Sequence, residues 1–363
     1  MKLKVTQENL SKALGHVARV ANPRGTLPIL ANVLLSIEDN RLKLATTNLD
    51  IAIASFIGAQ VQKPGSLTVP ARLLQDLVSG LPAGVIELEQ EDNKLKITAT
   101  HHKAVINGVA ADEFPVMPAI ENGVSWSVPT QNLKEGLQQV IIAASGDEAR
   151  PVLTGVFFHT TSGQLYIAST DSYRLAEKRL ISLKKDMKVL IPASTLHDVL
   201  RVINDQTGDV EIVCDDQQVL FKTGDVEIVA RLIEGNYPDY RKLIPSSFET
   251  TAIAPRSELI NITKVTSLFA RESAGSVVLS VDDASETLWL RAVASQLGEN
   301  NATASVKASG SGSITLNSRY LLDALQAMTG KDVRIGFNGK LEAVLLSDPE
   351  NDDYNHLIMP LKS

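Results

Sequence analysis

The sequence has little cysteine, histidine or aromatic content, and it lacks a long apolar run. Its single cysteine, Cys214, excludes an internal disulfide and any metal site built on several cysteines. Cys214 lies in the strand-like stretch EIVCDD with no cation beside it in sequence, which predicts a buried structural thiol. The most apolar segment, Ile51 to Ala59, already contains a serine and a glycine, and a spanning helix needs ~18 apolar residues. We therefore expect no association with a membrane.

The first residues, MKLKVTQENL, have no apolar stretch after their lysines, so we expect no secretory leader and a cytoplasmic protein. Of the 363 residues, 44% are hydrophobic and 21% are charged, as in ordinary globular proteins. The formal net charge of −7 does not favour nucleic-acid binding by the chain as a whole. Contact with a nucleic acid would need locally concentrated basic residues.

One sequence pattern occurs three times. SLTVPARLLQDLVSGLP, VLIPASTLHDVLRVIN and ITLNSRYLLDALQAMTG each combine a β-branched run, a Pro or Asn that starts a helix, and apolar residues at helical spacing. The equivalent positions Val69, Ile191 and Leu316 are 122 and then 125 residues apart. Three equivalent helices are predicted, with apolar positions at Leu73, Leu77 and Val78; Leu196, Val199, Leu200 and Ile203; and Leu321, Leu322, Leu325 and Met328.

Three further features recur in the same order. Each repeat opens with a predicted helix, in segments that start at Lys4, Ser127 and Ile253. Strand-like segments follow, with equivalent leucines 123 residues apart at Leu42, Leu165 and Leu288. Alternating segments typical of hairpins start at Gly84, Gly208 and Gly330. Four features in one order and near one period predict an α+β chain of three repeats, each with two helices and antiparallel sheets.

The repeats predict three domains, at residues 1–121, 122–246 and 247–363, with boundaries in the loops Glu121 to Gly123 and Ser246 to Glu249. The stretch Ala308 to Ser313 is rich in serine and glycine, as linkers are. Because it leads straight into a strand-like segment of the third repeat, we expect it to be a loop inside that repeat.

The usual catalytic and metal-binding motifs are missing, among them phosphate-binding loops, HExxH, CxxC and GxSxG. The adjacent His101 and His102 are expected on opposite faces of a strand, which does not suit joint ligation of a metal. Acidic pairs such as Asp112-Glu113 fall at turns without a partner base. We expect no catalytic residue, no metal and no cofactor, so the chain is not predicted to be an enzyme.

Polar faces of the predicted helices carry rows of basic residues. Lys12, His16 and Arg19 lie at spacings of four and three, and Arg24 follows in the next loop. Similar rows are Ser194, His197, Arg201 and Asn204; Lys134 with Gln138; and Asn261 with Lys264. Each row alone fits a solvated helix face. Recurrence on equivalent helices favours one surface that faces a polyanion.

The segment from Thr170 to Leu175 directly follows a predicted strand, and two interpretations of it stay open. In one, Asp171 caps a turn and Arg174 pairs with a carboxylate. In the other, the segment forms the rim of a partner-binding site.

Taken together, these segments resemble the bacterial sliding clamps, the beta subunits of DNA polymerase III. The likeness covers the whole chain and includes TLPILANVLL, VPAR, EFP, TGVFF, TDSYRLA, NYPDYRKLIP and the final MPLKS. It implies three clamp domains per chain in a head-to-tail homodimer ring, with helices lining the central hole around DNA. The implied function is that of a non-catalytic processivity factor. Implied partners are double-stranded DNA without sequence preference, the replicative polymerase, the clamp loader, repair polymerases and mismatch-repair proteins.

The resemblance also assigns residues. With the helical rows, the expected DNA-facing residues are Lys12, Arg19, Arg24, Arg72, Lys134, Arg201 and Lys264. A peptide pocket between the second and third domains is implied at Leu153, Thr170, Arg174, Leu175, Pro238, Lys242, Leu243, Leu357, Met359, Pro360 and Leu361. The dimer contact is expected to join Ala104 and Ile106 to Leu268 and Phe269.

This chain departs from the family pattern at Ser172-Tyr173, where Gly-His is frequent, and at Lys362, where Arg is frequent. Both departures bear on which partners the pocket prefers. Two alternatives stay open: a clamp-like paralogue, for example one that confers resistance to a clamp-directed inhibitor, and a repeat-built hydrolase. The hydrolase would need paired carboxylates in a pocket, and the sequence does not indicate such a pair.

Overall fold

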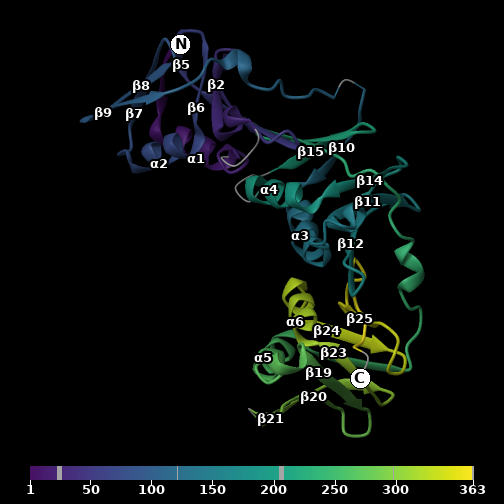
Figure 1. The fold of residues 1–363 in the computed structure, drawn as a ribbon. Coiled ribbons are helices and arrows are strands. Elements are labelled where there is room, and N and C mark those ends of the chain that lie inside the picture. The colour runs from purple at the N-terminus through teal and green to yellow at the C-terminus, as the bar shows by residue number, and fades with distance from the viewer. Residues whose placement is uncertain (23–26, 121, 204–207, 297, 362–363) are drawn as a thin grey trace. The chain divides into compact units, whose positions relative to one another are not determined.

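The computed structural model describes the chain except residues 23–26, 121, 204–207, 297 and 362–363 (Figure 1). Contacts divide the chain into two units. The first unit comprises Met1–Gln131 and His197–Leu232, and the second comprises Asn132–Leu196 and Ile233–Ser363. The units follow the sheets rather than the repeats, because the middle repeat contributes strands to both. The three domain boundaries proposed from the sequence remain predictions.

The first unit contains two antiparallel sheets. One has the order β5 (Gln60–Lys63), β1 (Lys2–Thr6), β7 (Val85–Glu91), β8 (Lys94–Ala99) and β9 (His102–Asn107). The other has the order β10 (Val124–Pro129), β15 (Asp209–Cys214), β16 (Gln218–Thr223), β17 (Val226–Arg231), β4 (Ile51–Gly58), β3 (Arg41–Thr47), β2 (Asn32–Glu38) and β6 (Ser66–Pro70). Short 3₁₀ turns are η1 (Pro28–Ala31) and η2 (Ala111–Glu113).

Two helices, α1 (Gln7–Val17) and α2 (Ala71–Gly80), pack side by side in the first unit (Figure 1). The Thr6 hydroxyl accepts a hydrogen bond from the Asn9 amide at 3.4 Å and caps α1. Leu10, Leu14 and Val17 follow at helical spacing and are fully buried. The polar side of α1 therefore faces solvent.

The second unit also contains two antiparallel sheets. One has the order β14 (Lys188–Pro192), β11 (Gly155–Thr161), β12 (Gln164–Thr170), β13 (Arg174–Ser182), β26 (Tyr354–Ile358), β25 (Val344–Ser347), β24 (Asp332–Phe337), β18 (Thr250–Pro255) and β22 (Lys307–Ser309). The other has the order β21 (Gly298–Ser305), β20 (Thr287–Ala294), β19 (Ser276–Asp282) and β23 (Gly312–Asn317).

Helices α5 (Arg256–Ser267) and α6 (Ser318–Ala327) pack together in the second unit. The ends of α3 (Thr130–Val140) and α4 (Ala193–Ile203) fall in different units. The remaining 3₁₀ turns are η3 (Ile141–Ala143), η4 (Pro151–Thr154), η5 (Tyr240–Leu243) and η6 (Arg271–Ser273). Among the described residues, no helix combines the length and apolar character that crossing a membrane requires.

The predicted repeat is confirmed at the level of elements. Leu42, Leu165 and Leu288 lie in the equivalent strands β3, β12 and β20, and each is fully buried. The predicted helix starts are also confirmed, since Pro70 precedes α2 and the Asn317 side chain accepts from the Arg319 amide at 2.9 Å at the start of α6.

Several sequence predictions need correction. The opening helices begin later than predicted, because β1, β10 and β18 occupy the first residues of those segments. In α2, Leu73 is 54% exposed and Leu74 takes the buried position, since Ala71, Leu74 and Val78 share the inner face. A Leu-Leu pair does not tell from spacing alone which leucine points inward.

Two local segments also differ from prediction. Lys307–Ser309 forms β22, which pairs Ala308 with Ala252, so only Gly310 and Ser311 lie outside strands in the predicted loop. The serine and glycine content suggested a loop, but small side chains are also compatible with strand pairing. His101 occupies the turn before β9 with φ of 62°, and His102 begins β9, so the pair does not lie within one strand.

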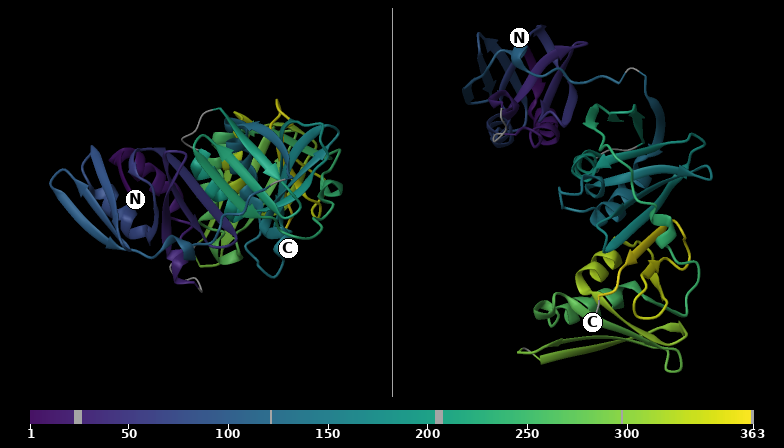
Figure 2. Two further views of the ribbon diagram at one scale, coloured as in Figure 1. Left: turned by 90° about the horizontal axis from the view of Figure 1, so that it is seen from above. Right: turned by 45° about the vertical axis from the view of Figure 1, so that its right-hand side comes forward.

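Antiparallel pairing joins consecutive repeats into continuous sheets. At the first junction Ile53 of β4 faces Ile228 of β17, and at the second junction Leu175 of β13 faces Leu357 of β26. After η2 the described chain runs in extended form toward β10 (Figure 2). Each junction therefore combines a strand pair with a connecting segment.

Candidate functional site

Three arginines from three helical regions line one groove in the first unit. Arg19 lies two residues after the end of α1, Arg72 lies in the first turn of α2 and Arg201 in the last turn of α4. The groove has a volume of about 570 Å³ and is completed by Ala18, Gln75 and Asp76. A neighbouring hollow of about 370 Å³ adds Lys12. The structure thus brings together four residues predicted to face DNA.

The apolar faces of the helices explain why these cations point outward. In α2, burial of Leu74 and Val78 leaves Arg72 exposed. In α4, Val199 and Val202 are buried and Arg201 is exposed. The predicted row on α4 is confirmed at Ser194 and His197, which are also exposed, whereas Asn204 lies outside the described residues.

The groove carries more positive than negative charge. Arg201 Nη1 contacts Asp198 Oδ1 at 2.7 Å. Burial raises the pKa of Asp198, while Arg201, His197 and Arg19 act in the opposite direction. The groove and the neighbouring hollow together therefore contain four cations, Lys12, Arg19, Arg72 and Arg201, and two carboxylates, those of Asp76 and Asp198. Such a surface attracts phosphates without reading bases.

The other predicted DNA-facing residues lie elsewhere. Lys134 on α3 is half-buried, and Lys264 on α5 is exposed; both belong to the second unit. Arg24 lies outside the described residues.

The turn from Thr170 to Leu175 has the predicted hairpin chemistry. Asp171 Oδ1 accepts hydrogen bonds from the amides of Tyr173 and Arg174, both at 2.9 Å. The Arg174 guanidinium contacts Asp171 at 3.1 Å and Asp323 at 2.7 Å, and it lies 4.5 Å from the ring centre of Tyr320. The interpretation in which Asp171 caps and Arg174 pairs is confirmed, and its use by a partner remains a proposal.

An apolar cluster lies beside this turn in the second unit. Its buried members are Ala168, Leu175, Tyr240, Ala343, Leu345 and Leu357, and Phe157, Tyr237, Ile244 and Phe248 pack against them. Leu243 and Met359 are more open, at 56% and 39% exposed. The Met359 amide donates to the Tyr173 carbonyl at 2.8 Å, which fixes the C-terminal segment next to the turn.

The predicted pocket residues thus divide into a floor and a rim. The floor consists of residues that are buried: Leu153, Thr170, Leu175 and Leu357. The rim consists of the half-buried Arg174, Pro360 and Leu361 and the exposed Pro238, Lys242, Leu243 and Met359. Lys242 Nζ contacts Asp239 at 2.7 Å on the open side. An apolar floor with a polar rim suits an apolar peptide.

Sequence reasoning missed a buried polar network that includes Tyr240 of this cluster. His159 Nε2 lies 2.6 Å from Tyr240 Oη, and Tyr240 Oη donates to Glu177 Oε2 at 2.5 Å. Arg241 Nε also donates to Glu177 Oε2, at 3.1 Å, and its guanidinium lies 4.1 Å from the Tyr166 ring centre. The network fastens η5 to β11 and β13. The only sequence signal was the alternation of aromatic and charged residues in NYPDYRKLIP.

Burial lowers the pKa of His159 to about 4, and the nearby charges of Arg241 and Lys188 act in the same direction. The imidazole is therefore neutral near pH 7. Because the Tyr240 hydroxyl donates to Glu177, the network assigns the His159 proton to Nε2, where it can be donated to Tyr240.

The predicted dimer residues differ in exposure. Leu268 is 50% exposed and Phe269 is half-buried at the end of α5, and Ala104 is half-buried in β9. Ile106 is only 4% exposed, because its side chain points to the covered face of its sheet, whereas neighbouring Val105 is 59% exposed. Ile106 thus packs inside its own sheet, and its place in the dimer contact remains a prediction.

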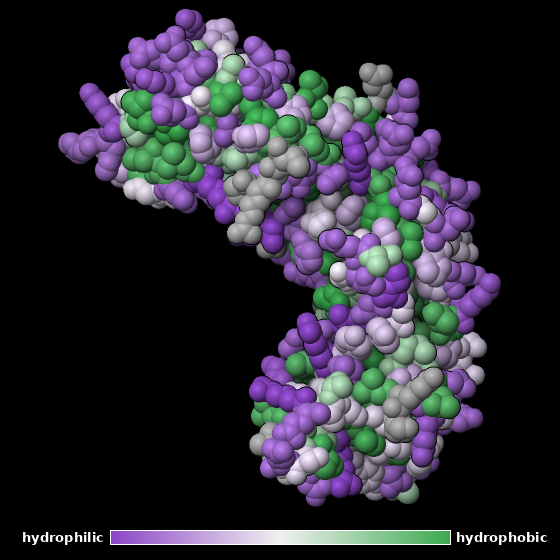
Figure 3. All heavy atoms as spheres, viewed as in Figure 1, coloured by the Kyte–Doolittle hydropathy of each residue, from purple (hydrophilic) through white to green (hydrophobic). Residues whose placement is uncertain are grey.

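Exposed apolar residues gather near this strand. Figure 3, viewed as Figure 1, shows a hydrophobic patch over the end of the first unit where α2, β7 and β9 lie. Leu73, Val85 and Val105 are the exposed large apolar residues of these three elements. Among the described residues, β9 and β21 each end a sheet, and exposed apolar residues lie near both edges.

The structure bears on the remaining sequence predictions. Cys214 is buried, which confirms the structural thiol, and burial raises its pKa to about 12. Across the described residues, no group of three or more His, Cys, Asp or Glu side chains is arranged to hold a metal ion.

Comparison with known proteins gives consistent matches along the chain. Residues 1–118, 127–239 and 241–362 match the N-terminal, central and C-terminal domain models of the DNA polymerase III beta subunit. Beta sliding clamps from Bacillus subtilis and a Synechocystis strain are 30% and 33% identical, and the alignments span all of this chain and 100% and 99% of those proteins.

Solved structures agree. The sliding clamp of Bacillus subtilis matches with a TM-score of 0.95 at 29% identity, over 100% of this chain and 99% of that one. A Pseudomonas aeruginosa sliding clamp bound to griselimycin matches with a TM-score of 0.95 at 26% identity, over 100% of both chains.

The repeated two-helix units and these matches define a three-domain clamp protein of DNA replication. The chain belongs to the bacterial beta sliding clamps, the beta subunits of DNA polymerase III. Membership confirms the sequence resemblance and places DNA and a DNA polymerase among its partners. The paralogue and the hydrolase are not favoured.

Proposed function

We propose that this clamp encircles duplex DNA as a head-to-tail homodimer ring and tethers its partners through the pocket at the second junction. The observation that carries this proposal is the groove of Lys12, Arg19, Arg72 and Arg201, which gathers cations from three helical regions of an acidic chain. Phosphate contacts from such side chains carry no sequence information. They therefore suit a protein that must slide.

Topological holding removes the need for tight binding. Exposed cations contribute an attraction that falls steeply with salt. A closed ring stays on DNA even when each contact is weak, because leaving requires the ring to open. The net charge of −7 also limits nonspecific adhesion to nucleic acid.

Ring closure is proposed to join the edge strand β9 of one protomer to the edge strand β21 of its partner. Both strands end their sheets, so each has unpaired backbone groups. Ala104 and Val105 near one edge, and Leu268 with Phe269 near the end of α5, supply apolar side chains for the contact. Two such head-to-tail contacts, related by a two-fold axis, would close the ring.

The partner pocket is proposed to accept a short apolar peptide from the replicative polymerase. The same pocket would serve the clamp loader, repair polymerases and mismatch-repair proteins in turn. Supporting evidence is the apolar cluster with its exposed rim at Leu243 and Met359. We further propose that the chain is not itself an enzyme and that it works in the cytoplasm, where the bacterial chromosome lies.

The test uses two rim variants, Arg174→Ala and Met359→Ala, with Leu341→Ala as a matched control, since Leu341 is an exposed apolar residue of a loop in the same unit. Binding of a peptide from the replicative polymerase is measured by fluorescence anisotropy, and assembly by sedimentation. Both rim variants should lose peptide binding and remain dimers, while the control keeps both properties. Parent-level peptide binding by both rim variants would show that the pocket is assigned wrongly.

A further inference from the structure

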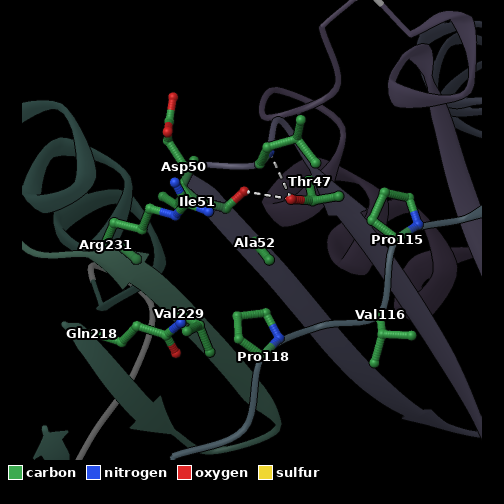
Figure 4. Close-up of a pocket in the computed structure, with 12 residues that line it drawn as sticks. Thr47, Asp50, Ile51, Ala52, Pro115, Val116, Pro118, Gln218, Val229 and Arg231 are labelled. Carbon is green, nitrogen blue, oxygen red and sulfur yellow. Dashed lines mark hydrogen bonds between the residues drawn. The ribbon is translucent and has the colours of Figure 1, made fainter.

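The first unit contains a cavity of about 270 Å³ that the proposed function does not use. It lies where β4 pairs with β17, beside the connecting segment that carries Pro115 and Pro118 (Figure 4). Ala52 and Val229 form part of the wall, and Arg231 completes the lining on one side. All of these residues belong to one unit.

The turn at this junction repeats the turn at the second junction, with Thr47 in the place of Thr170. The Thr47 hydroxyl donates to the Ile51 carbonyl at 3.0 Å, and the Thr170 hydroxyl donates to the Arg174 carbonyl at 2.6 Å. Leu49 and Ser172, the third residues of the two turns, have φ of 80° and 79°.

The Asx contacts also match. Asn48 Oδ1 accepts from the amides of Asp50 and Ile51 at 3.0 and 2.9 Å, as Asp171 Oδ1 does from its two following amides. The same backbone frame is therefore built at both junctions.

Strand register extends the equivalence to the pocket floor. Ala52 faces Val229 between β4 and β17, in the positions that Leu175 and Leu357 occupy between β13 and β26. The side chains at the first junction are smaller. Where the second junction has a floor filled by leucines and tyrosines, the first leaves an open hollow.

The residues that line the hollow indicate which kind of ligand fits it. A volume of about 270 Å³ lies below the ~300 Å³ at which pockets for drug-sized molecules begin, so the hollow suits one or two side chains of a peptide. Its lining combines apolar side chains with polar groups, and Val116, one of the lining residues, is 93% exposed. Arg231 is exposed and has no ion pair within the part of the chain that the structure describes. Asp50 also lines the hollow, and Figure 4 shows its carboxylate directed away from Pro118 and Val229.

We propose that this hollow is a second docking site, which takes a short partner segment with an aliphatic side chain next to a carboxylate. The aliphatic side chain fills the space over Ala52 and Val229, and the carboxylate pairs with Arg231. This inference rests on the proposed function, since the peptide pocket at the second junction is its template. Each protomer would then present two different sites, so two partners could be held at once.

The test places a reporter at each junction of the full-length protein. Val116→Cys introduces a thiol at a 93% exposed position, and Tyr173→Cys does so at a 59% exposed position of the second junction. Cys214 is buried and has a raised pKa, so a thiol-reactive, environment-sensitive dye labels the introduced site. The first probe is a panel of hexapeptides that carry two adjacent leucines and one aspartate at varied positions. The second is a peptide from the replicative polymerase.

We expect at least one acidic hexapeptide to give a saturable signal at the position-116 reporter. Arg231→Glu should raise its dissociation constant at least tenfold, Arg231→Lys should change it less than threefold, and replacing the aspartate by lysine should abolish the signal. Met359→Ala, at the second junction, should leave it unchanged.

The two reporters separate this inference from the proposed function. A response to the polymerase peptide at position 173 with no hexapeptide response at position 116 would overturn the second site and leave the proposed function standing. A hexapeptide signal at position 116 that is insensitive to Arg231→Glu would also overturn it. A charge-dependent response at position 116 with no polymerase-peptide response at position 173 would support the second site and contradict the proposed pocket.

Discussion

Single residues set the chemistry of the second junction. His159, Tyr240 and Glu177 form a chain of hydrogen bonds in which every member is buried. A buried polar group is stable only when its partners are present, so this chain fixes η5 in one place. The apolar residues that pack around Tyr240 then have a rigid support for the proposed peptide.

The lowered pKa of His159 predicts that acid weakens the fold around this network. The unfolded histidine titrates near 6.5 and the folded one near 4. Its stabilising contribution is therefore complete above pH 6.5 and is lost as the pH falls toward 4. Between pH 7 and pH 5 the free energy of unfolding should fall by about 2 kcal/mol from this residue alone.

Urea unfolding at the two pH values measures this effect. His159→Gln should reduce the difference between pH 7 and pH 5 by that amount, whereas His101→Gln, at an exposed turn, should leave it unchanged. His356, whose pKa burial lowers to about 3, contributes equally to all three proteins and so cancels. An unaltered pH dependence in His159→Gln would refute the role assigned to this imidazole.

The groove cations predict a salt dependence for DNA association. Lys12 lines the hollow next to Arg19 and Arg201. If it contacts one phosphate, Lys12→Gln should lower the slope of log affinity against log salt by about one and weaken all duplex sequences equally. Lys222→Gln is the control, because Lys222 is a lysine of β16 that pairs with Glu227.

Affinity for short duplexes is measured by anisotropy between low and moderate salt. Identical slopes for the Lys12 variant, the Lys222 variant and the parent protein would remove Lys12 from the DNA-facing surface.

At the scale of elements, strand edges determine how the chain can associate. β9 and β21 each end a sheet, whereas the internal junctions β4–β17 and β13–β26 are already paired. An uncovered edge with apolar side chains favours pairing with another chain. The same kind of strand pairing would then join domains both within a chain and between chains.

This predicts that Val105→Lys weakens the dimer, because it places a charge in the proposed contact. Its dissociation constant should rise at least tenfold, as measured by sedimentation over a range of concentrations. Leu341→Lys adds the same charge at a 73% exposed loop residue and should leave the dimer intact. Equal dimer stability in the two variants would exclude β9 from the interface.

Much of this element pattern could be predicted from the sequence, and the reason is the repeat. One copy alone leaves a short apolar run ambiguous, but the coincidence of Leu42, Leu165 and Leu288 assigned three buried strands at once. Local signals also sufficed where a cap was involved, as at Asn317. The inner face of α2 was missed because Leu73 and Leu74 are chemically identical neighbours.

Other features depended on contacts between distant residues. The pairing of Ile53 with Ile228 has no sequence signal in either strand, so the continuous sheets could not be predicted. The basic residues were identified as separate rows, and the groove that unites Arg19, Arg72 and Arg201 emerged only from the fold. The polar network around His159 was not predicted either, because its members are far apart in the sequence.

At the scale of the whole molecule, three repeats of one unit give a chain in which every junction has related geometry. The two internal junctions share a turn and a strand register, yet differ in side chains at the floor. A repeat can thus keep one backbone frame while each copy acquires its own binding surface. We propose that this family member works by closing around DNA and by binding partners at these junctions. Its individual contacts with DNA are then weak.

The central claim is that the protein holds DNA by topology. The direct measurement is retention on nicked circular DNA in high salt after loading by a clamp loader, before and after one cut linearises the circle. Retention on circles and loss after cutting is the expected result, because high salt suppresses phosphate contacts on both forms alike. Equal loss from circular and linear DNA, with the loader shown to be active on another sliding clamp, would contradict the closed ring.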